Sequence, residues 1–439
     1  FFFLRLGRQV CLSVVTLGSF IRHKIRCFLK ELKILWIFAM VCLSSVTSGQ
    51  ELTSSQYELN YYFVIEPKQD RAKVRIELGE RADRVVELRL RLGEASLADL
   101  KADGELEIGS PVIWQPPEEG GSLTYSVPLT HKRSDSGYDA YVAEDWAIFR
   151  GDDLVPAISA RTKAGYESRA KLFFELPDAW SVVTPFRPSR QGGYYVVNDK
   201  RRFHRPVGWM MVGQFGQRIG EIKGIRVVIA APKDQGFRRM DTLAFMQWNM
   251  TELKKIFPKY PNRLLILGAG NPMWRGGLSG PRSLFMHSDR PMISENGTSS
   301  LMHEIVHTAL RVSSDEDDWI VEGLAEFYSL EIMRRSKTLS RARFNTALNS
   351  LKKWGKDVES LRGKQSKGPV TARAVGVFYA LDKELRKKSG KEYSLDDVAR
   401  TLAEEGGKVS LDQLRNIAES YVDEELKSLS VTALPGIED

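Results

Sequence analysis

Short segments with alternating apolar and polar positions follow one another from residue 50 to about residue 160. They are YELNYYFVIEP (57–67), AKVRIELGE (72–80), RVVELRLRLG (84–93) and SLTYSVPLTH (122–131), separated by Gly, Pro and Asp turns. Alternation of this kind is typical of strands with one buried face. We therefore expect residues 50–160 to form a β-sandwich domain, immunoglobulin-like or related, that supports or positions a substrate.

Strand and helix patterns mix after residue 160. The expected strands are KLFFEL (171–176), YYVVND (194–199), IRVVIAA (225–231) and RLLILGA (263–269), with a helix near 240–256. After residue 294 the pattern is almost entirely helical. This order predicts a multidomain α+β protein, with a mixed-sheet domain over 161–335 and a helical C-terminal region over 336–439.

The first 49 residues have a different composition from the rest. A basic start at 30–33, an apolar stretch of about 13 residues over 34–46 and small residues at 47–49 are typical of a secretory signal peptide ending near Gly49. The apolar stretch is too short for a membrane span. We expect a secreted or periplasmic protein with no stable membrane insertion after cleavage. An uncleaved N-terminal membrane anchor is the alternative.

Setting this leader aside changes the charge and cysteine balance. The whole chain has 64 Lys and Arg, 56 Asp and Glu, and a net charge of +8. The leader holds seven of the basic residues and one of the acidic ones, which leaves 57 and 55. The basic character therefore belongs mostly to the leader, and it gives no support for nucleic-acid binding. All three cysteines (Cys11, Cys27 and Cys42) also lie in the leader, so the remainder has no disulfide or thiol chemistry.

The stretch SSLMHEIVHTALRV (299–312) carries the most specific chemical signal in the chain. It reads as a helix, with Ser or Thr at 298–300 available as an N-cap. His303 and His307 are four positions apart, so both imidazoles lie on one helix face and can reach one metal ion. Glu304 lies beside them, where it can act as a general base. Two half-exposed structural histidines are the alternative.

A second predicted helix, WIVEGLAEFYSLEIMRR (319–335), supplies further carboxylates. Glu322 and Glu326 are again four positions apart on one face. Glu322 can complete a His-His-Glu zinc site, while Glu326 can hydrogen-bond the ring nitrogen of a histidine and orient it. Gly323, unfavourable inside a helix, indicates a close approach between two helices near the metal. A solvated acidic helix edge is the alternative.

The two motifs together resemble those of the gluzincin metallopeptidases, in particular the glycyl aminopeptidase family and its aminopeptidase N relatives. The likeness covers roughly residues 50–425, and it is strong at the zinc motif and weak elsewhere. It implies a thermolysin-like catalytic domain over 161–335, one zinc ion, and a peptide or protein substrate. The GGLSG segment (276–280) falls where the family has its substrate-binding strand, which implies substrate contacts for Gly276, Gly277, Leu278 and Ser279.

The resemblance also has departures. Ser279 and Gly280 stand where the family has a glutamate and a histidine, and that glutamate holds the free amine of an aminopeptidase substrate. Arg373 stands where the family has its transition-state tyrosine. Arg373 could stabilise an oxyanion by its charge, and Tyr379, two turns later, is another candidate. Exopeptidase and endopeptidase activity therefore both remain open.

Two other chemical candidates are weaker. His287 follows the GGLSG segment and could line the same cleft, although a lone histidine in a strand is more often structural. The acidic run 315–318 could bind calcium but lacks the glycine and the ligand pattern of a dedicated loop, so we expect it to be a solvated loop.

The sequence therefore predicts a zinc metallopeptidase in which a metal-activated water attacks the peptide bond and Glu304 is the general base. A catalytically weak, zinc-bound module that binds peptides or envelope proteins is the main alternative. A zinc hydrolase for a substrate other than a peptide is a third.

Overall fold

The computed structural model describes residues 52–437 apart from 94–96 and 136. The chain divides into two compact units, residues 1–53 and 54–439. The predicted leader over 1–49 thus lies outside the described residues. None of the described helices is both long and apolar enough to cross a membrane.

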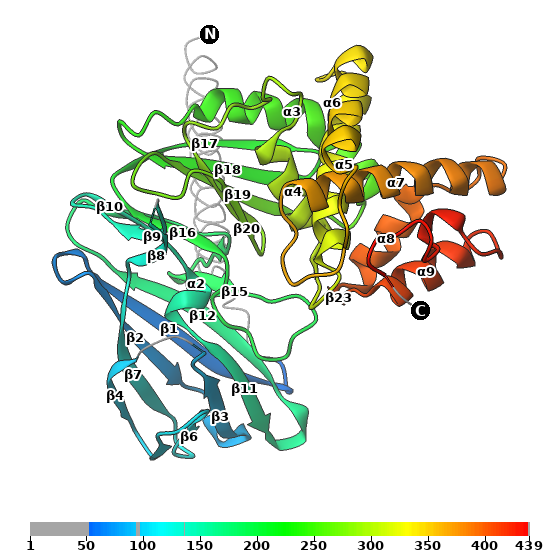
Figure 1. Ribbon diagram of the computed structural model, residues 1–439. Helices are drawn as coiled ribbons and strands as arrows, with labels where there is room; N and C mark the ends of the chain where they lie inside the picture. The colour runs from blue at the N-terminus through cyan, green and yellow to red at the C-terminus, as the bar shows by residue number, and fades with distance from the viewer. Residues whose placement is uncertain (1–51, 94–96, 136, 438–439) are drawn as a thin grey trace, which may run out of the picture. The chain divides into compact units, whose positions relative to one another are not determined.

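Two sheets form the N-terminal part of the second unit (Figure 1). The seven-stranded sheet has the order β14 (Arg187–Pro188), β15 (Tyr194–Val196), β12 (Glu167–Glu175), β1 (Gln56–Glu66), β2 (Arg71–Leu78), β7 (Gly121–Pro128) and β4 (Ala98–Ala102). The four-stranded sheet has the order β11 (Ala157–Thr162), β3 (Val85–Arg91), β6 (Val112–Gln115) and β5 (Glu105–Glu107). Alternate residues of both sheets, such as Leu59, Phe63, Leu88 and Trp114, are fully buried in one core. Apolar and polar residues therefore alternate along these strands because one face of each strand is buried, as expected.

The pairing of β12 differs from our expectation. Its sequence, which we had assigned to the mixed-sheet domain after residue 160, lies parallel to β1 from Gln56 opposite Glu167 to Val64 opposite Glu175. β15 then pairs with β12, so both strands belong to the N-terminal sheet. A short apolar run encodes that a strand forms but not which sheet edge it joins, because backbone pairing is the same at either edge.

A third sheet lies between the N-terminal core and a five-stranded mixed sheet that is described next. Its order is β13 (Ser181–Val183), β16 (Trp209–Gly213), β10 (Trp146–Arg150), β9 (Gly137–Val142) and β8 (His131–Ser134). Ala147 and Phe149 face the N-terminal core, whereas Trp146 and Ile148 face the other way. Both faces of β10 are therefore buried, which explains why WAIFR carries four apolar or aromatic residues in five positions.

The five-stranded mixed sheet has both parallel and antiparallel strand pairs. Its order is β17 (Phe215–Ile222), β18 (Ile225–Pro232), β19 (Arg263–Ala269), β21 (Ser283–His287) and β20 (Gly277–Gly280), with β20 at one edge. Leu265, Leu267 and Phe285 pack on the third sheet, while Ile266 and Met286 face the helices. The continuous apolar runs of β18 and β19 follow from burial on both faces.

Eight helices occur in the described residues, and most follow the sheets (Figure 1). They are α2 (Gly151–Leu154), α3 (Arg239–Ile256), α4 (Ser300–Leu310), α5 (Asp318–Arg335), α6 (Arg341–Trp354), α7 (Pro369–Lys388), α8 (Leu395–Glu405) and α9 (Leu411–Ser420). Two short strands, β22 (Val312–Ser313) and β23 (Gly407–Lys408), join the ends of α4 and α8. The mixed α+β class is confirmed.

Gly323 lets α5 approach α7 closely. A Cβ atom at Gly323 would lie 2.4 Å from Cβ of Ala374 and 2.8 Å from Cε2 of Phe378, both on α7. Trp319, one turn earlier on α5, stacks on Phe378 with ring centroids 5.7 Å apart. The glycine thus marks a close helix contact, as the sequence indicated. The helix that it meets is α7 rather than the histidine-bearing α4.

This contact yields a stability prediction. Gly323→Ala should lower the free energy of unfolding by about 1–3 kcal/mol, because the methyl group overlaps α7. Gly376→Ala is the matched control, since a Cβ there would have Lys352 Cγ at 3.8 Å as its nearest neighbour. Inside α7 it should be neutral or stabilise by up to about 1 kcal/mol. Denaturant unfolding of both variants measures the difference, and equal effects would contradict the close contact.

Candidate metal centre

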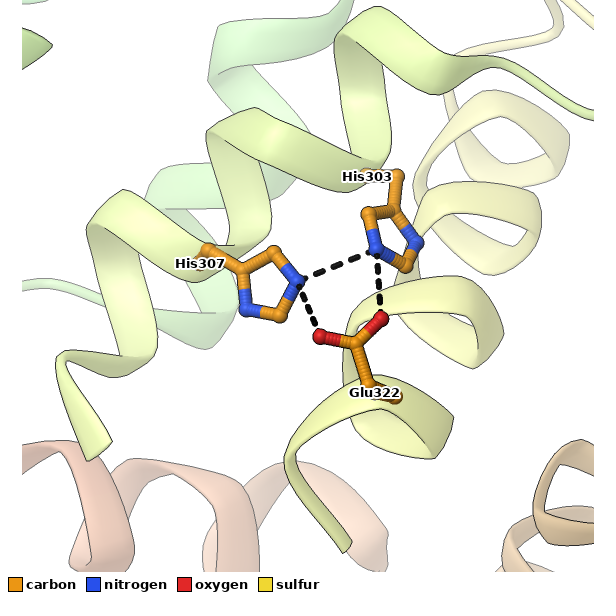
Figure 2. A group of neighbouring side chains, drawn as sticks. All are labelled: His303, His307 and Glu322. Carbon is orange, nitrogen blue, oxygen red and sulfur yellow. Dashed lines mark hydrogen bonds and ion pairs between the residues drawn. The ribbon is translucent and has the colours of Figure 1, made fainter. Parts of the chain in front are cut away.

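His303 and His307 converge from one face of α4. Ser299 caps the helix, its hydroxyl oxygen accepting the backbone N–H of Met302, and Arg311 ends it with a left-handed backbone. The Nε2 atoms of the two histidines are 3.0 Å apart (Figure 2). Their side chains are only 14% and 13% exposed, so the pair lies in a recess rather than on an open surface.

Glu322 reaches the same point from α5 (Figure 2). One of its carboxylate oxygens is 3.2 Å from Nε2 of His303, and the other is 3.3 Å from Nε2 of His307. A tetrahedral ion with bonds of about 2.0–2.1 Å keeps its ligand atoms about 3.3 Å apart. The spacing of these three groups therefore fits a zinc ion at their centre. Within the described part of the chain, this is the one group of three such donors close enough to share an ion.

Glu326 lies behind His303. A carboxylate oxygen of Glu326 is 2.9 Å from Nδ1 of His303, on the opposite side of the ring from Glu322. An N–H at Nδ1 donating to Glu326 leaves the lone pair of Nε2 free for a metal ion. The two glutamates of α5, four residues apart, thus contact His303 at its two ring nitrogens.

The carboxylates also set the protonation of the metal-free site. Burial opposes a charge on His303, but hydrogen bonds to Glu322 and Glu326 outweigh it and raise the pKa of His303 well above its usual value. Burial likewise opposes the charge of Glu322, yet His303 and His307 hold the pKa of Glu322 far below its usual range. Protons therefore compete with a metal ion for the histidine nitrogen.

Glu304 lies against the edge strand β20. A Cβ atom at Gly277 would be 2.5 Å from Cγ of Glu304 and 2.7 Å from Cε of Met286. The absence of a side chain at Gly277 is therefore what leaves room for the Glu304 carboxylate. The residue proposed as a general base and the strand proposed to bind substrate are in direct contact.

The other residues of the GGLSG segment occupy different positions. Gly276 precedes β20 and lies against the Trp274 indole, since a Cβ there would be 2.3 Å from its Nε1. Leu278 faces the third sheet and packs on its apolar core. Ser279 lies on the wall of a cleft of about 920 Å³ that also includes His307. Gly277 and Ser279 therefore lie on the site side of β20, and Leu278 does not.

Arg373 and Tyr379 make their contacts elsewhere. The Arg373 guanidinium donates to the backbone carbonyl of Ala433, near the C-terminus, at 3.3 Å. The Tyr379 ring lies between the ammonium groups of Lys352 and Lys383, which are 4.2 and 4.4 Å from its centroid. Neither side chain is paired with the histidine cluster. This placement differs from the predicted oxyanion role, because the positions of both residues around α7 direct them to α6 and the C-terminal segment.

His287 also lies away from the cleft. It is fully buried on the face of β21 that packs on the third sheet, where its Nδ1 accepts the backbone N–H of Asp289 at 3.1 Å. Burial lowers the pKa of His287 and favours its neutral form. The structural alternative for this histidine therefore fits its environment.

Each of the four carboxylates in the acidic run 315–318 has a nearby partner. Asp315 pairs with Lys408, and Glu316 pairs with Arg362. Asp317 accepts the backbone N–H of Leu411, and Asp318 accepts that of Ser366. These carboxylates connect the start of α5 to neighbouring loops, so they are not grouped around a common cation position.

Most of the cleft wall has no recognisable signal in the sequence. The segment 197–207, the β20–β21 turn and residues 403–407 meet there with His307, although they are far apart along the chain. The basic residues of these segments are ordinary in sequence context. The clustering of Lys and Arg over 200–205 is the one pattern that could have drawn attention to this wall.

Comparison with protein family models and with curated sequences gave no match. Solved structures share the fold. An aminopeptidase N family protein from Idiomarina loihiensis aligns with a TM-score of 0.61 and 14% identity, over 87% of this chain and 76% of that one. Aminopeptidase A from Legionella pneumophila, solved with aspartic acid, aligns with a TM-score of 0.55 and 13% identity, over 88% of this chain and 50% of that one. This chain thus spans half the length of the Legionella protein, and the predicted likeness to aminopeptidases is confirmed at the level of the fold.

The geometry predicts a graded loss of zinc binding. His303→Ala or His307→Ala should abolish tight binding, and Glu322→Ala should lose most of it, because two ligands hold zinc weakly. Glu326→Ala should weaken affinity by about 10–100-fold. Competition with a chelator measures the affinities, which should fall as the pH is lowered because His303 then keeps its proton.

His131→Ala is the matched control for these variants. Its side chain is 64% exposed and pairs with Asp139, away from the site. It should bind zinc as the unchanged protein does. Full zinc content in His303→Ala or His307→Ala would refute the ligand set.

Proposed function

We propose that this chain is a zinc-dependent metallopeptidase. The observation that carries the proposal is the convergence of His303, His307 and Glu322, whose ring nitrogens and carboxylate oxygens lie 3.0–3.3 Å from one another, with Glu304 nearby against the edge strand β20. The fold shared with aminopeptidases supports it. Zinc, when bound, supplies a Lewis acid that polarises a carbonyl and lowers the pKa of water.

Two glutamates of the chain would control the protons of the proposed reaction. Glu304, beside the histidines but outside the donor triangle, would accept a proton from the attacking water and deliver it to the leaving amine. Glu326 would keep His303 in the tautomer that offers Nε2, through its contact with Nδ1. Each carboxylate near the site thus has a separate task set by its position.

The edge strand would hold the substrate. β20 pairs with β21 on one side only, so alternate backbone N–H and C=O groups point away from the sheet. An extended peptide can add to such an edge through main-chain hydrogen bonds. The Gly277 contact with Glu304 would then bring the general base close to a peptide bond bound along β20.

Serine at position 279 gives this strand no carboxylate to hold a free amine. Ser279 instead lies on the wall of the cleft of about 920 Å³. We therefore include cleavage within a chain, and not only removal of terminal residues, in the proposed activity. The proposed secreted or periplasmic location rests on residues 30–50 alone, and sequencing of the mature N-terminus from an expressing cell tests it.

Glu304→Gln tests the mechanism. The change keeps the size of the side chain and removes its ability to carry a proton. Hydrolysis should fall by about 10²–10⁴-fold while zinc content and melting temperature stay unchanged. Peptide turnover at the unchanged rate with zinc bound would overturn the role of Glu304. If neither the unchanged protein nor the variant cleaves a peptide library, but both bind peptides equally, the zinc-bound binding module is the better reading.

Gly277→Ala tests the contact between strand and base. The new methyl group would overlap Cγ of Glu304, so the carboxylate must move. Displacement of a catalytic group by about 1 Å commonly costs on the order of 10²-fold in rate. We expect such a loss in kcat/KM with zinc content unchanged, since no ligand is touched. Unchanged kcat/KM would mean that Glu304 does not depend on Gly277 for its position.

A further inference from the structure

The cleft beside the candidate metal centre is lined by cations. It has a volume of about 920 Å³, and His307 is part of its wall. Its basic residues are Arg150, Lys200, Arg201, Arg205, Arg282 and Arg311, and its acidic residues are Asp199 and Glu405. Six positive groups therefore face two negative ones, although the chain after residue 49 is almost neutral overall.

Three of these cations have carboxylate partners. Arg282 and Arg311 share Asp199, at 2.5 and 2.9 Å. Arg150 pairs with Asp152 at 2.6 Å. These pairs hold the wall together, and their two carboxylates offset two of the three positive charges.

The other three cations have no carboxylate partner among the described residues. Lys200 donates to the backbone carbonyls of Glu404 and Glu405. Arg205 donates to the carbonyl of Val155. Arg201 is exposed, and no hydrogen bond or ion pair of its side chain is seen within the described part of the chain. Carbonyl groups orient a cation without neutralising it, so this part of the wall keeps a net positive charge.

Arg205 shows the imbalance most clearly. Burial lowers the pKa of Arg205, and the nearby Asp152, already paired with Arg150, offsets this only in part. A half-buried guanidinium without its own counter-ion is costly in free energy. A bound anion would supply the missing partner.

The rest of the lining indicates a polypeptide rather than a small anion. Phe186, Phe203, Ile158 and Val197 line the same cleft, and Val197 is 46% exposed. Apolar side chains together with cations suit a peptide that carries both apolar and acidic residues.

We propose that the cleft binds the part of a peptide substrate that carries carboxylate side chains, next to the bond held at His303, His307 and Glu322. The proposal rests on the proposed peptidase function for the role of that bond. It adds a substrate class, acidic peptides. The carboxylates would pair with Lys200, Arg201 and Arg205, which the protein itself leaves without acidic partners.

Binding to the Glu304→Gln variant tests the proposal without turnover. Fluorescently labelled peptides with Glu or Asp are compared with the same peptides carrying Gln or Asn, each with a free and an amidated C-terminus. We expect the acidic peptides to bind about tenfold more tightly at low ionic strength, and added salt to reduce the difference. A preference that depends only on the free C-terminus, or none at all, would overturn the proposal.

Arg201→Glu identifies the surface responsible. It should abolish the preference for acidic peptides while leaving the affinity for amide peptides and the zinc content unchanged. Arg190→Ala and Arg190→Glu are the matched controls, because Arg190 is also an exposed loop arginine and does not line the cleft. Equal effects at positions 190 and 201 would reduce the preference to general charge attraction and refute the site.

The two proposals fail separately in these experiments. Preferential binding of acidic peptides without any hydrolysis by the unchanged protein would keep the binding site and reject the peptidase function. Hydrolysis of acidic and amide peptides with equal kcat/KM, and equal binding of both, would keep the peptidase function and reject the acidic substrate class.

Discussion

Three polar side chains must meet in a recess between α4 and α5, and much of the surrounding packing serves this meeting. Removing imidazole and carboxylate groups from water costs several kcal/mol unless each finds a partner. His303, His307 and Glu322 find partners in one another, and Glu326 satisfies the remaining nitrogen of His303. The same arrangement gives a metal ion three convergent ligands, so the need for polar partners and the proposed chemistry point to one geometry.

The glycines near the site serve close contacts of two kinds. Gly323 brings α5 against α7 and so fixes the helix that carries Glu322. Gly277 leaves room for Glu304 at the edge of the sheet. In the first case backbone meets an apolar helix face, and in the second it meets a carboxylate. A side chain at Gly277 would displace the Glu304 carboxylate, whereas a side chain at Gly323 would overlap Ala374 and Phe378 of α7.

One loop of the N-terminal part completes the cleft. Asp199 joins Arg311 at the end of α4 to Arg282 in the β20–β21 turn, and Lys200 holds the end of α8. The β-rich part therefore contributes directly to the wall beside the metal centre instead of serving only as a support. Because Asp199 is already shared by two arginines, the remaining cations face the cleft with a net positive charge.

The sequence alone determined the parts of the site that depend on local geometry. Helix periodicity places His303 with His307 and Glu322 with Glu326, whatever the rest of the fold does. Tertiary structure decided the rest. The direction of Arg373 toward Ala433 depends on how α7 is rotated against its neighbours, and the pairing of β12 with β1 depends on which sheet edge is free. The cationic cleft unites residues more than 200 positions apart, as Lys200 and Glu405 show, and no local pattern encodes such a meeting.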